Sequence, residues 1–217
     1  MATWVDTDYV RGITGLTSED ISDEDLEFFI EVSQKEILMK INEQETREPV
    51  NFLDQTRDND IDGLNVDYYI ANWEGNWISD YNYDLEVGTS DVIVYSVDTD
   101  GVETKPAIAS ITPAEGKITL STAQNNATLA ITYAYSNIDP VTPDPRLMLA
   151  AGYLTAAYSY LRLSEGGKTD VRFGNTVIKE NLMANSESYF TKYTQLIDVI
   201  TQSVDGGVLY GFNVNQI

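Results

Sequence analysis

The chain has 217 residues and a formal net charge of −22 at pH 7, and it contains neither cysteine nor histidine. The missing residue types exclude disulfides, thiolate nucleophiles, and the commonest general base and transition-metal ligand in proteins. The negative charge disfavours binding to nucleic acid or anionic lipid, and without a run of about 20 apolar residues no membrane span is expected.

The first elements are a short one over residues 3–11 and a long helix that begins after Ser22. The first eleven residues lack a basic stretch followed by an apolar one, so no secretory signal is expected. Ser22 and the acidic run 23–25 are typical of a helix start, because a serine caps and carboxylates suit the positive end of the helix dipole. About five turns should follow, with one apolar face. That face comprises Leu26, Phe29, Ile30, Ile37, Leu38 and Ile41.

A polar segment over residues 54–63 follows, and it contains a possible calcium motif. Asp58, Asp60, Asp62 and Gly63 match the first six positions of the calcium loop D-x-D-x-D-G. The twelfth position, where a bidentate glutamate belongs, is Tyr69. This departure favours a solvated acidic loop, with calcium bound by the three aspartates as the alternative; no other cofactor is expected.

Residues 66–135 have β character, with turn residues at short intervals that indicate antiparallel strands. The clearest strand is 128–135, in which apolar and small residues alternate. An aromatic cluster that includes Trp73 and Trp77 lies earlier in this region. Such a cluster stacks sugars or anchors protein partners in some proteins, but a buried aromatic core is the favoured interpretation.

Two further helices are predicted near the end of the chain. Asp144 and Pro145 supply a helix cap and a first-turn proline for a helix rich in alanine. Gly166 and Gly167 end it, a short extended piece follows over 171–178, and the last helix spans about 179–203. The segment 204–217 contains three glycines among apolar residues and resembles an arm that awaits a partner.

These elements predict an α+β fold: a helical bundle, made of the early helix and the two C-terminal helices, with an inserted antiparallel β domain. The expected domains are a helical one over 1–65 and 136–203, the β insertion over 66–135, and a docking arm over 204–217.

The order of elements resembles the head–tail connector or adaptor proteins of long-tailed bacteriophages and related archaeal viruses. The resemblance covers roughly the first fifty and last eighty residues. It lies in the opening stretch 8–17, in residues 21–26 with the helix that follows, and in the late helices 147–163 and 179–203 joined through Phe173-Gly-Asn. The β insertion departs from the compact family form.

The resemblance implies a non-enzymatic virion protein, assembled in the host cytoplasm, that forms a ring, usually of twelve subunits. The ring would join the portal to a stopper, neck or tail protein, and genome DNA would pass through its lumen without specific binding. The C-terminal arm would dock on the portal through Leu209, Tyr210, Phe212 and Val214. The alternative function is a surface module that binds glycan or protein through Trp73 and Trp77 of the β domain.

Overall fold

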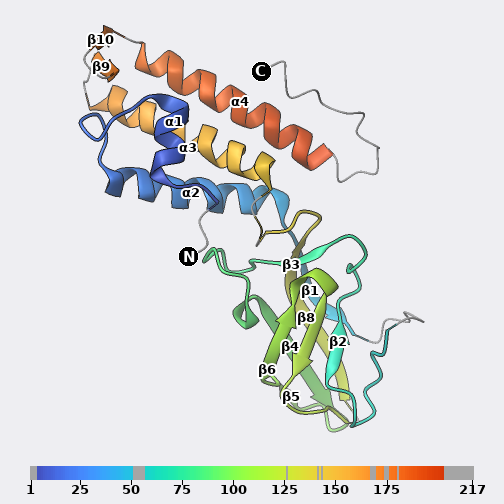
Figure 1. Cartoon of the computed structure of the whole chain (residues 1–217). Helices are drawn as coiled ribbons and strands as arrows, with labels where there is room; N and C mark the ends of the chain where they lie inside the picture. Colours follow the sequence, from blue (N-terminus) through green and yellow to red (C-terminus); the bar gives the residue numbers. More distant parts are fainter. Residues whose placement is uncertain are drawn as a thin grey trace. The chain divides into compact units, whose positions relative to one another are not determined.

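The computed structural model describes residues 4–50, 57–125, 127–140, 142, 144–166, 170–173, 176–179 and 181–202 (Figure 1). They fall into two compact units. The β unit lies within Asn42–Asp144, and the helical unit lies within Thr3–Ile41 and Pro145–Ile217. The fold is therefore α+β, with an antiparallel β unit inserted into a helical one, as predicted. The β unit is wider than the expected 66–135. Among the described residues, no helix is long and apolar enough to cross a membrane.

The helical unit is built around a single buried helix. Its helices are α1 (Thr7–Thr14), α2 (Asp23–Ile41), α3 (Pro145–Glu165) and α4 (Leu182–Gln202), and the short antiparallel strands β9 (Asp170–Phe173) and β10 (Thr176–Lys179) lie between α3 and α4 in the chain. In Figure 1, α3 runs between α2 and α4, and it packs against all three other helices. Its small side chains, among them Ala150, Ala151 and Ala157, are buried and permit this close approach.

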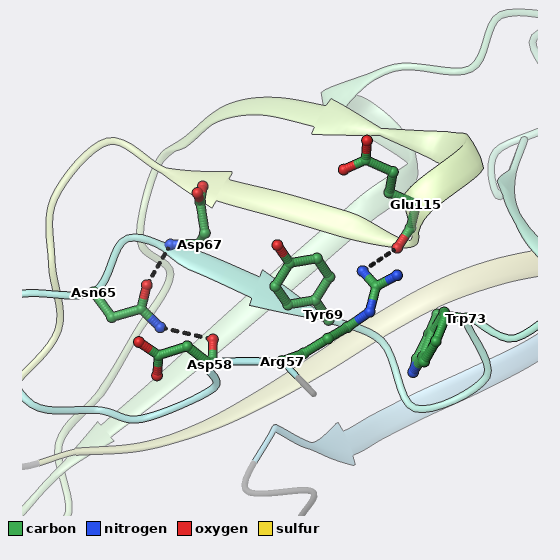
Figure 2. Close-up of a pocket in the computed structure, with 7 residues that line it drawn as sticks. All are labelled: Arg57, Asp58, Asn65, Asp67, Tyr69, Trp73 and Glu115. Carbon is green, nitrogen blue, oxygen red and sulfur yellow. Dashed lines mark hydrogen bonds between the residues drawn. The ribbon is translucent and has the colours of Figure 1, made fainter. Parts of the chain in front are cut away.

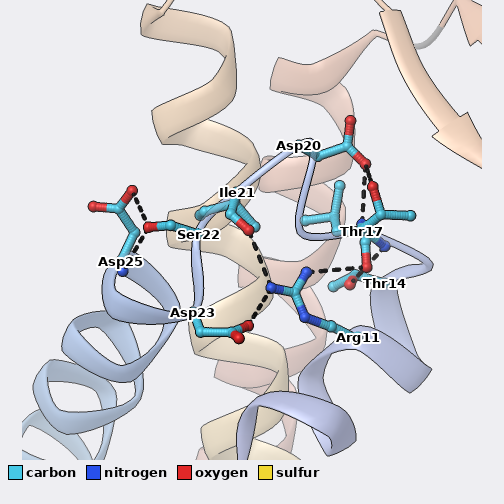
Figure 3. Close-up of polar contacts among 9 residues, drawn as sticks. Arg11, Thr14, Thr17, Asp20, Ile21, Ser22, Asp23 and Asp25 are labelled. Atoms are coloured by element: carbon cyan, nitrogen blue, oxygen red, sulfur yellow. Dashed lines mark hydrogen bonds and ion pairs between the residues drawn. The ribbon is translucent and has the colours of Figure 1, made fainter.

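The turn between α1 and α2 is fixed by polar contacts that Figure 3 shows. The Ser22 hydroxyl accepts a hydrogen bond from the Asp25 backbone N–H at 3.1 Å and donates to the Asp25 carboxylate at 2.9 Å, which caps α2 as its sequence predicts. Arg11 donates from Nη2 to the Ile21 carbonyl at 3.1 Å and pairs with Asp23 at 2.5 Å. Arg11 of α1 thus ties its own helix to the start of α2.

Helix α1 packs against α3 at Gly152. A Cβ at this position would lie 2.7 Å from Cδ1 of Ile13 and 2.9 Å from Cε1 of Tyr9, so only glycine leaves room for α1 as it stands. The hydroxyls of Tyr160 and Tyr189 donate to the Thr14 and Ile13 carbonyls at 2.9 and 3.0 Å. These bonds satisfy carbonyls at the end of α1 that lack a partner within the helix.

The β unit holds two antiparallel sheets. The larger comprises β1 (Glu43–Pro49), β8 (Ala127–Ser136), β4 (Val92–Asp98) and β5 (Glu103–Thr104) in that order, with β3 (Trp77–Ser79) also paired to β8. The smaller comprises β2 (Asp67–Tyr69), β7 (Lys117–Leu120) and β6 (Ile108–Thr112). Two short 3-10 turns, η1 (Thr89–Asp91) and η2 (Pro113–Glu115), precede β4 and β7. Both sheets contribute to one core, whose fully buried members are Val50, Tyr68, Ile70, Ile78, Val92, Val94, Ile118, Leu120, Leu129, Ile131 and Tyr133.

Strand β8 is the centre of the larger sheet and pairs with the first strand of the β unit. Glu43, at the start of β1, pairs with Tyr135 near the end of β8. The last long strand of the β unit therefore ends beside the point at which its first strand begins.

The polar edge strand β1 was not anticipated, because its sequence, EQETREP, has no apolar alternation. Side-chain hydrogen bonds add to the backbone pairing between β1 and β8. The Tyr133 hydroxyl donates to Glu48 at 2.7 Å and the Tyr135 hydroxyl donates to Glu43 at 2.6 Å. Burial and the contact with Glu48 raise the pKa of Tyr133 well above its usual value, so this hydroxyl stays protonated and remains a donor. A bulge places Arg47 at φ 55°, and its guanidinium pairs with Glu103 at 2.8 Å.

The loop from β3 to η1 folds around two buried carboxylates. Asp80 accepts the Leu85 N–H at 2.7 Å, and Asp91 accepts the Tyr81 and Gly88 N–H groups at 2.9 and 2.8 Å. Leu85 adopts φ 68°, which this turn imposes on a residue that ordinarily avoids the left-handed region. Backbone N–H groups thus provide hydrogen bonds to both buried side chains.

Candidate functional site

An open hollow of about 610 Å³ lies on the β unit, beside β2 and η2. Figure 2 shows the side chains that line it. They are Arg57, Asp58, Asn65, Asp67, Tyr69, Trp73 and Glu115. The lining combines two aromatic rings with one cationic, one amide and three acidic side chains, so the hollow offers apolar faces together with hydrogen-bond donors and acceptors.

Arg57 lies between the two rings. Its Cζ is 4.3 Å from the centroid of Tyr69 and 3.8 Å from that of Trp73, within the range of cation–π contacts. Its Nη1 donates to the Glu115 carbonyl at 2.9 Å. The guanidinium therefore has a fixed plane and position, which a lysine would not keep.

The segment that carries Arg57 and Asp58 is tied to β2 by Asn59. The Asn59 side chain accepts from the Tyr69 N–H at 2.9 Å and donates to the Tyr69 carbonyl at 3.3 Å, so it pairs with the strand as a neighbouring backbone would. Asn65 donates to the Asp58 carbonyl and accepts the Asp67 N–H, both at 3.0 Å. Two asparagines thus set the spacing between the acidic side chains of the hollow.

The three aspartates of the possible calcium loop do not share one role. Asp58 lies on the hollow and accepts the Asp60 N–H at 3.0 Å. Asp62 accepts the Leu64 and Asn65 N–H groups at 2.8 and 2.9 Å. Both bonds lower the pKa of Asp62, and the bond from Asn65 has the larger effect. Within the described residues, no group of three or more acidic side chains is placed to hold a metal ion. Calcium binding stays a prediction.

The two tryptophans proposed from sequence lie in different places. Trp73 lines the hollow, whereas Trp77 lies on β3, where it pairs with Ser136 of β8. Tyr68, a few residues before Trp73 in the chain, is buried in the core. Arg57 was not predicted as a site residue, and its position next to the acidic segment 58–62 is the one sequence signal that points to it.

The helical unit exposes large apolar side chains on both helices that flank α3. Phe28 and Met39 of α2 are 60% and 58% exposed, and their separation of about three turns puts them on one side of the helix. Met183 and Phe190 of α4 are 49% and 47% exposed and lie about two turns apart. We refer to these pairs as the α2 stripe and the α4 stripe. The α2 stripe lies outside the apolar face that the sequence predicted for this helix.

The proposed docking residues Leu209, Tyr210, Phe212 and Val214 lie outside the described residues.

Comparisons with known proteins found no protein-family model that matches this chain and no curated protein with significant similarity to it.

Proposed function

We propose that the chain is a virion structural protein that assembles into a closed ring, joins the portal to the neck or tail, and surrounds the passing genome. The observation that carries the proposal is the α2 stripe together with the α4 stripe, on the two helices that flank α3. Burying side chains of this size is worth roughly 1.5–3 kcal/mol each. Two different apolar patches on one unit suit a head-to-tail contact, which closes into a ring when the rotation between copies permits it.

Two further features support the proposal. The helices α2, α3 and α4 follow one another in the order that the resemblance to head–tail adaptors implies, although the β unit inserted between α2 and α3 departs from the compact family form. The net charge of −22 suits a channel along which DNA slides without binding. Portal docking by the segment 204–217 is proposed from its sequence, as is the location of the protein in the virion neck.

The test compares the assembly state of the wild-type protein with that of stripe variants, in concentrated salt that screens the negative charge. Mass photometry and negative-stain images should show closed rings for the wild type. Phe28→Asp, on the α2 stripe, and Phe190→Asp, on the α4 stripe, should each give monomers. Val102→Asp is the matched control, because Val102 is 56% exposed but belongs to the β unit.

Mixing the two stripe variants gives a sharper result. Each variant keeps one intact stripe, so an equimolar mixture should form dimers and no rings if the contact is head-to-tail. A wild-type protein that stays monomeric at every concentration, or stripe variants that form rings as readily as Val102→Asp, would overturn the proposed interface. Portal docking is tested separately by adding purified portal rings to the full chain and to a chain shortened by residues 204–217.

A further inference from the structure

The turn between β4 and β5 contains the pair Asp100–Gly101, and an Asp-Gly pair can rearrange to isoaspartate without an enzyme. The glycine nitrogen attacks the carboxyl carbon of the aspartate before it, a C–N bond forms, and water leaves. The resulting succinimide ring takes up water at either carbonyl, so the main chain then runs through the α-carboxyl again or through the β-carboxyl. Glycine favours the attack because it has no Cβ to hinder the nitrogen and its backbone rotates freely.

The structure leaves both reacting groups of this turn accessible. Asp100 and Gly101 are exposed, and within the described part of the chain the Asp100 carboxylate accepts no hydrogen bond. The Gly101 N–H donates to the Asp98 carbonyl at 3.1 Å, inside the same turn, and a Cβ on Gly101 would meet nothing within 4 Å. The rotation that brings the nitrogen to the carboxyl carbon therefore disturbs the turn alone and leaves the core intact.

A second Asp-Gly pair among the described residues, Asp62–Gly63, is held in a way that opposes the same reaction. The N–H groups of Asn65 and Leu64 donate to the Asp62 carboxylate at 2.9 and 2.8 Å and lower its pKa. The Asp62 carboxyl is therefore seldom in the neutral form from which water can leave. The Gly63 N–H donates to the Gln124 carbonyl at 2.9 Å, on a distant segment of the β unit. Attack at Asp62 thus requires this loop to open first.

We infer that Asp100 is a site of spontaneous isomerisation to isoaspartate, and that the fold protects Asp62 from the same reaction. The inference goes beyond the ring function and does not rest on it, because the turn belongs to the β unit and the two stripes belong to the helical unit. Ring assembly and isomerisation are measured separately, so either proposal can fail alone.

Isomerisation at Asp100 has a structural consequence for β5, the edge strand of the larger sheet. Isoaspartate adds one methylene to the main chain, so the turn cannot keep its present hydrogen bonds. Among these bonds, the Val102 N–H donates to the Asp98 carboxylate at 2.8 Å. The next residue, Glu103, pairs with Arg47 of β1 at 2.8 Å. We expect the modified chain to lose the pairing of β5 with β4 and, with it, the position of Glu103.

The experiment stores the full chain in water labelled with heavy oxygen, at neutral pH and physiological temperature, both folded and unfolded in urea. Chymotryptic peptides are then sequenced by electron-transfer mass spectrometry, which distinguishes isoaspartate from aspartate and detects the heavy oxygen gained on hydrolysis. In the folded chain, both should accumulate at Asp100 at least about tenfold faster than at Asp62, because Asp62 reacts only after its loop opens. In urea the two rates should be similar, since no fold protects either pair.

A matched variant and an internal control identify the reaction. Asp100→Glu keeps the negative charge but would have to close a six-membered ring, which forms far more slowly. After the same storage, the native NMR amide signals of Val102 and Glu103 should decrease in the wild type and persist in the variant. Asp98 lies in the same turn but does not precede a glycine, and it should stay unmodified.

Three outcomes would overturn the inference. The first is a folded chain in which Asp100 stays unmodified although it reacts in urea. The second is a folded chain in which Asp62 or Asp98 reacts as fast as Asp100. The third is an Asp100→Glu variant that loses the Val102 and Glu103 signals at the wild-type rate.

Discussion

The absence of a side chain at Gly152 of α3 is what lets the ring of Tyr9 of α1 lie where it does, since a Cβ would come within 2.9 Å of that ring. Glycine inside a helix ordinarily costs about 0.5–1 kcal/mol relative to alanine. At position 152 the close approach of α1 leaves no room for a Cβ, and this steric effect opposes the preference of helices for alanine over glycine.

Gly152→Ala should therefore destabilise the helical unit by about 1–2 kcal/mol, because overpacking outweighs the gain in helix propensity. Urea unfolding followed by the helical circular dichroism signal measures the change. Gly12→Ala in α1 is the matched control, as its Cβ would meet nothing within 4 Å, and it should leave stability unchanged or raise it slightly. Equal effects of the two substitutions would contradict the packing argument.

Gly116→Ala should destabilise the β unit by about 2–4 kcal/mol, through its left-handed backbone and a clash. Gly116 has φ +61°, and a Cβ there would lie 2.8 Å from Cβ of Trp73 and 2.9 Å from Cγ1 of Ile70. Gly75→Ala isolates the backbone cost, because Gly75 has φ +73° but open space around it, and about 1–2 kcal/mol is expected. Tryptophan fluorescence during urea unfolding reports both. A loss at Gly116 no larger than that at Gly75 would show that the contact with Trp73 is unimportant.

Arg11→Met should cost more stability than Asp23→Asn, although the two residues form one ion pair. Asp23 is 65% exposed, so its part of the pair is worth at most about 1 kcal/mol. The Arg11 side chain is 17% exposed and also donates to the Ile21 carbonyl, which methionine leaves without that donor. A loss of about 1–3 kcal/mol is expected for Arg11→Met. Thermal unfolding of both variants measures the two losses of stability. If Asp23→Asn costs as much as Arg11→Met, or more, the hydrogen bond from Arg11 to the Ile21 carbonyl adds no stability.

Asp80 and Asp62 should titrate on opposite sides of the ordinary aspartate pKa. Burial is the largest cause that raises the pKa of Asp80, whereas backbone N–H groups lower that of Asp62. The native state then binds the Asp80 proton more tightly than the unfolded chain does. Its contribution to stability is full below the unfolded pKa and is lost as pH rises through the native pKa. Carboxyl-carbon NMR titration gives both pKa values directly.

A variant confirms the sign of the Asp80 effect. Asp80→Asn cannot titrate, so the stability advantage of the wild type over the variant should shrink as pH rises from the acid side to neutrality. An advantage that grows with pH would mean that the native pKa of Asp80 lies below its ordinary value.

Helix positions followed well from the sequence because their signals are local. Ser22 and Pro145 predicted the starts of α2 and α3, and the last helix, predicted over about 179–203, spans Leu182–Gln202. Strand β8, at Ala127–Ser136, matches the predicted strand 128–135 within about a residue at each end. Capping and periodicity were sufficient for these elements.

Features that depend on distant partners were not predictable. Gln34 of α2 is polar and is not part of the predicted apolar face, yet it is fully buried, and its side-chain oxygen accepts the Trp4 N–H at 2.8 Å. In the hollow, Trp73 belongs to the aromatic cluster for which a buried core was the favoured prediction and ligand contact the alternative. Arg57 gains its position only through Glu115 and the rings beside it. No local pattern encodes such contacts between residues far apart in sequence.

The pairing of Glu43 with Tyr135 has an evolutionary consequence. Insertion of a module into a domain is tolerated most readily where the ends of the module lie close together. The pairing of β1 with β8 brings the chain back towards its point of entry, so a module of this kind can be gained between two helices with little disturbance to their packing.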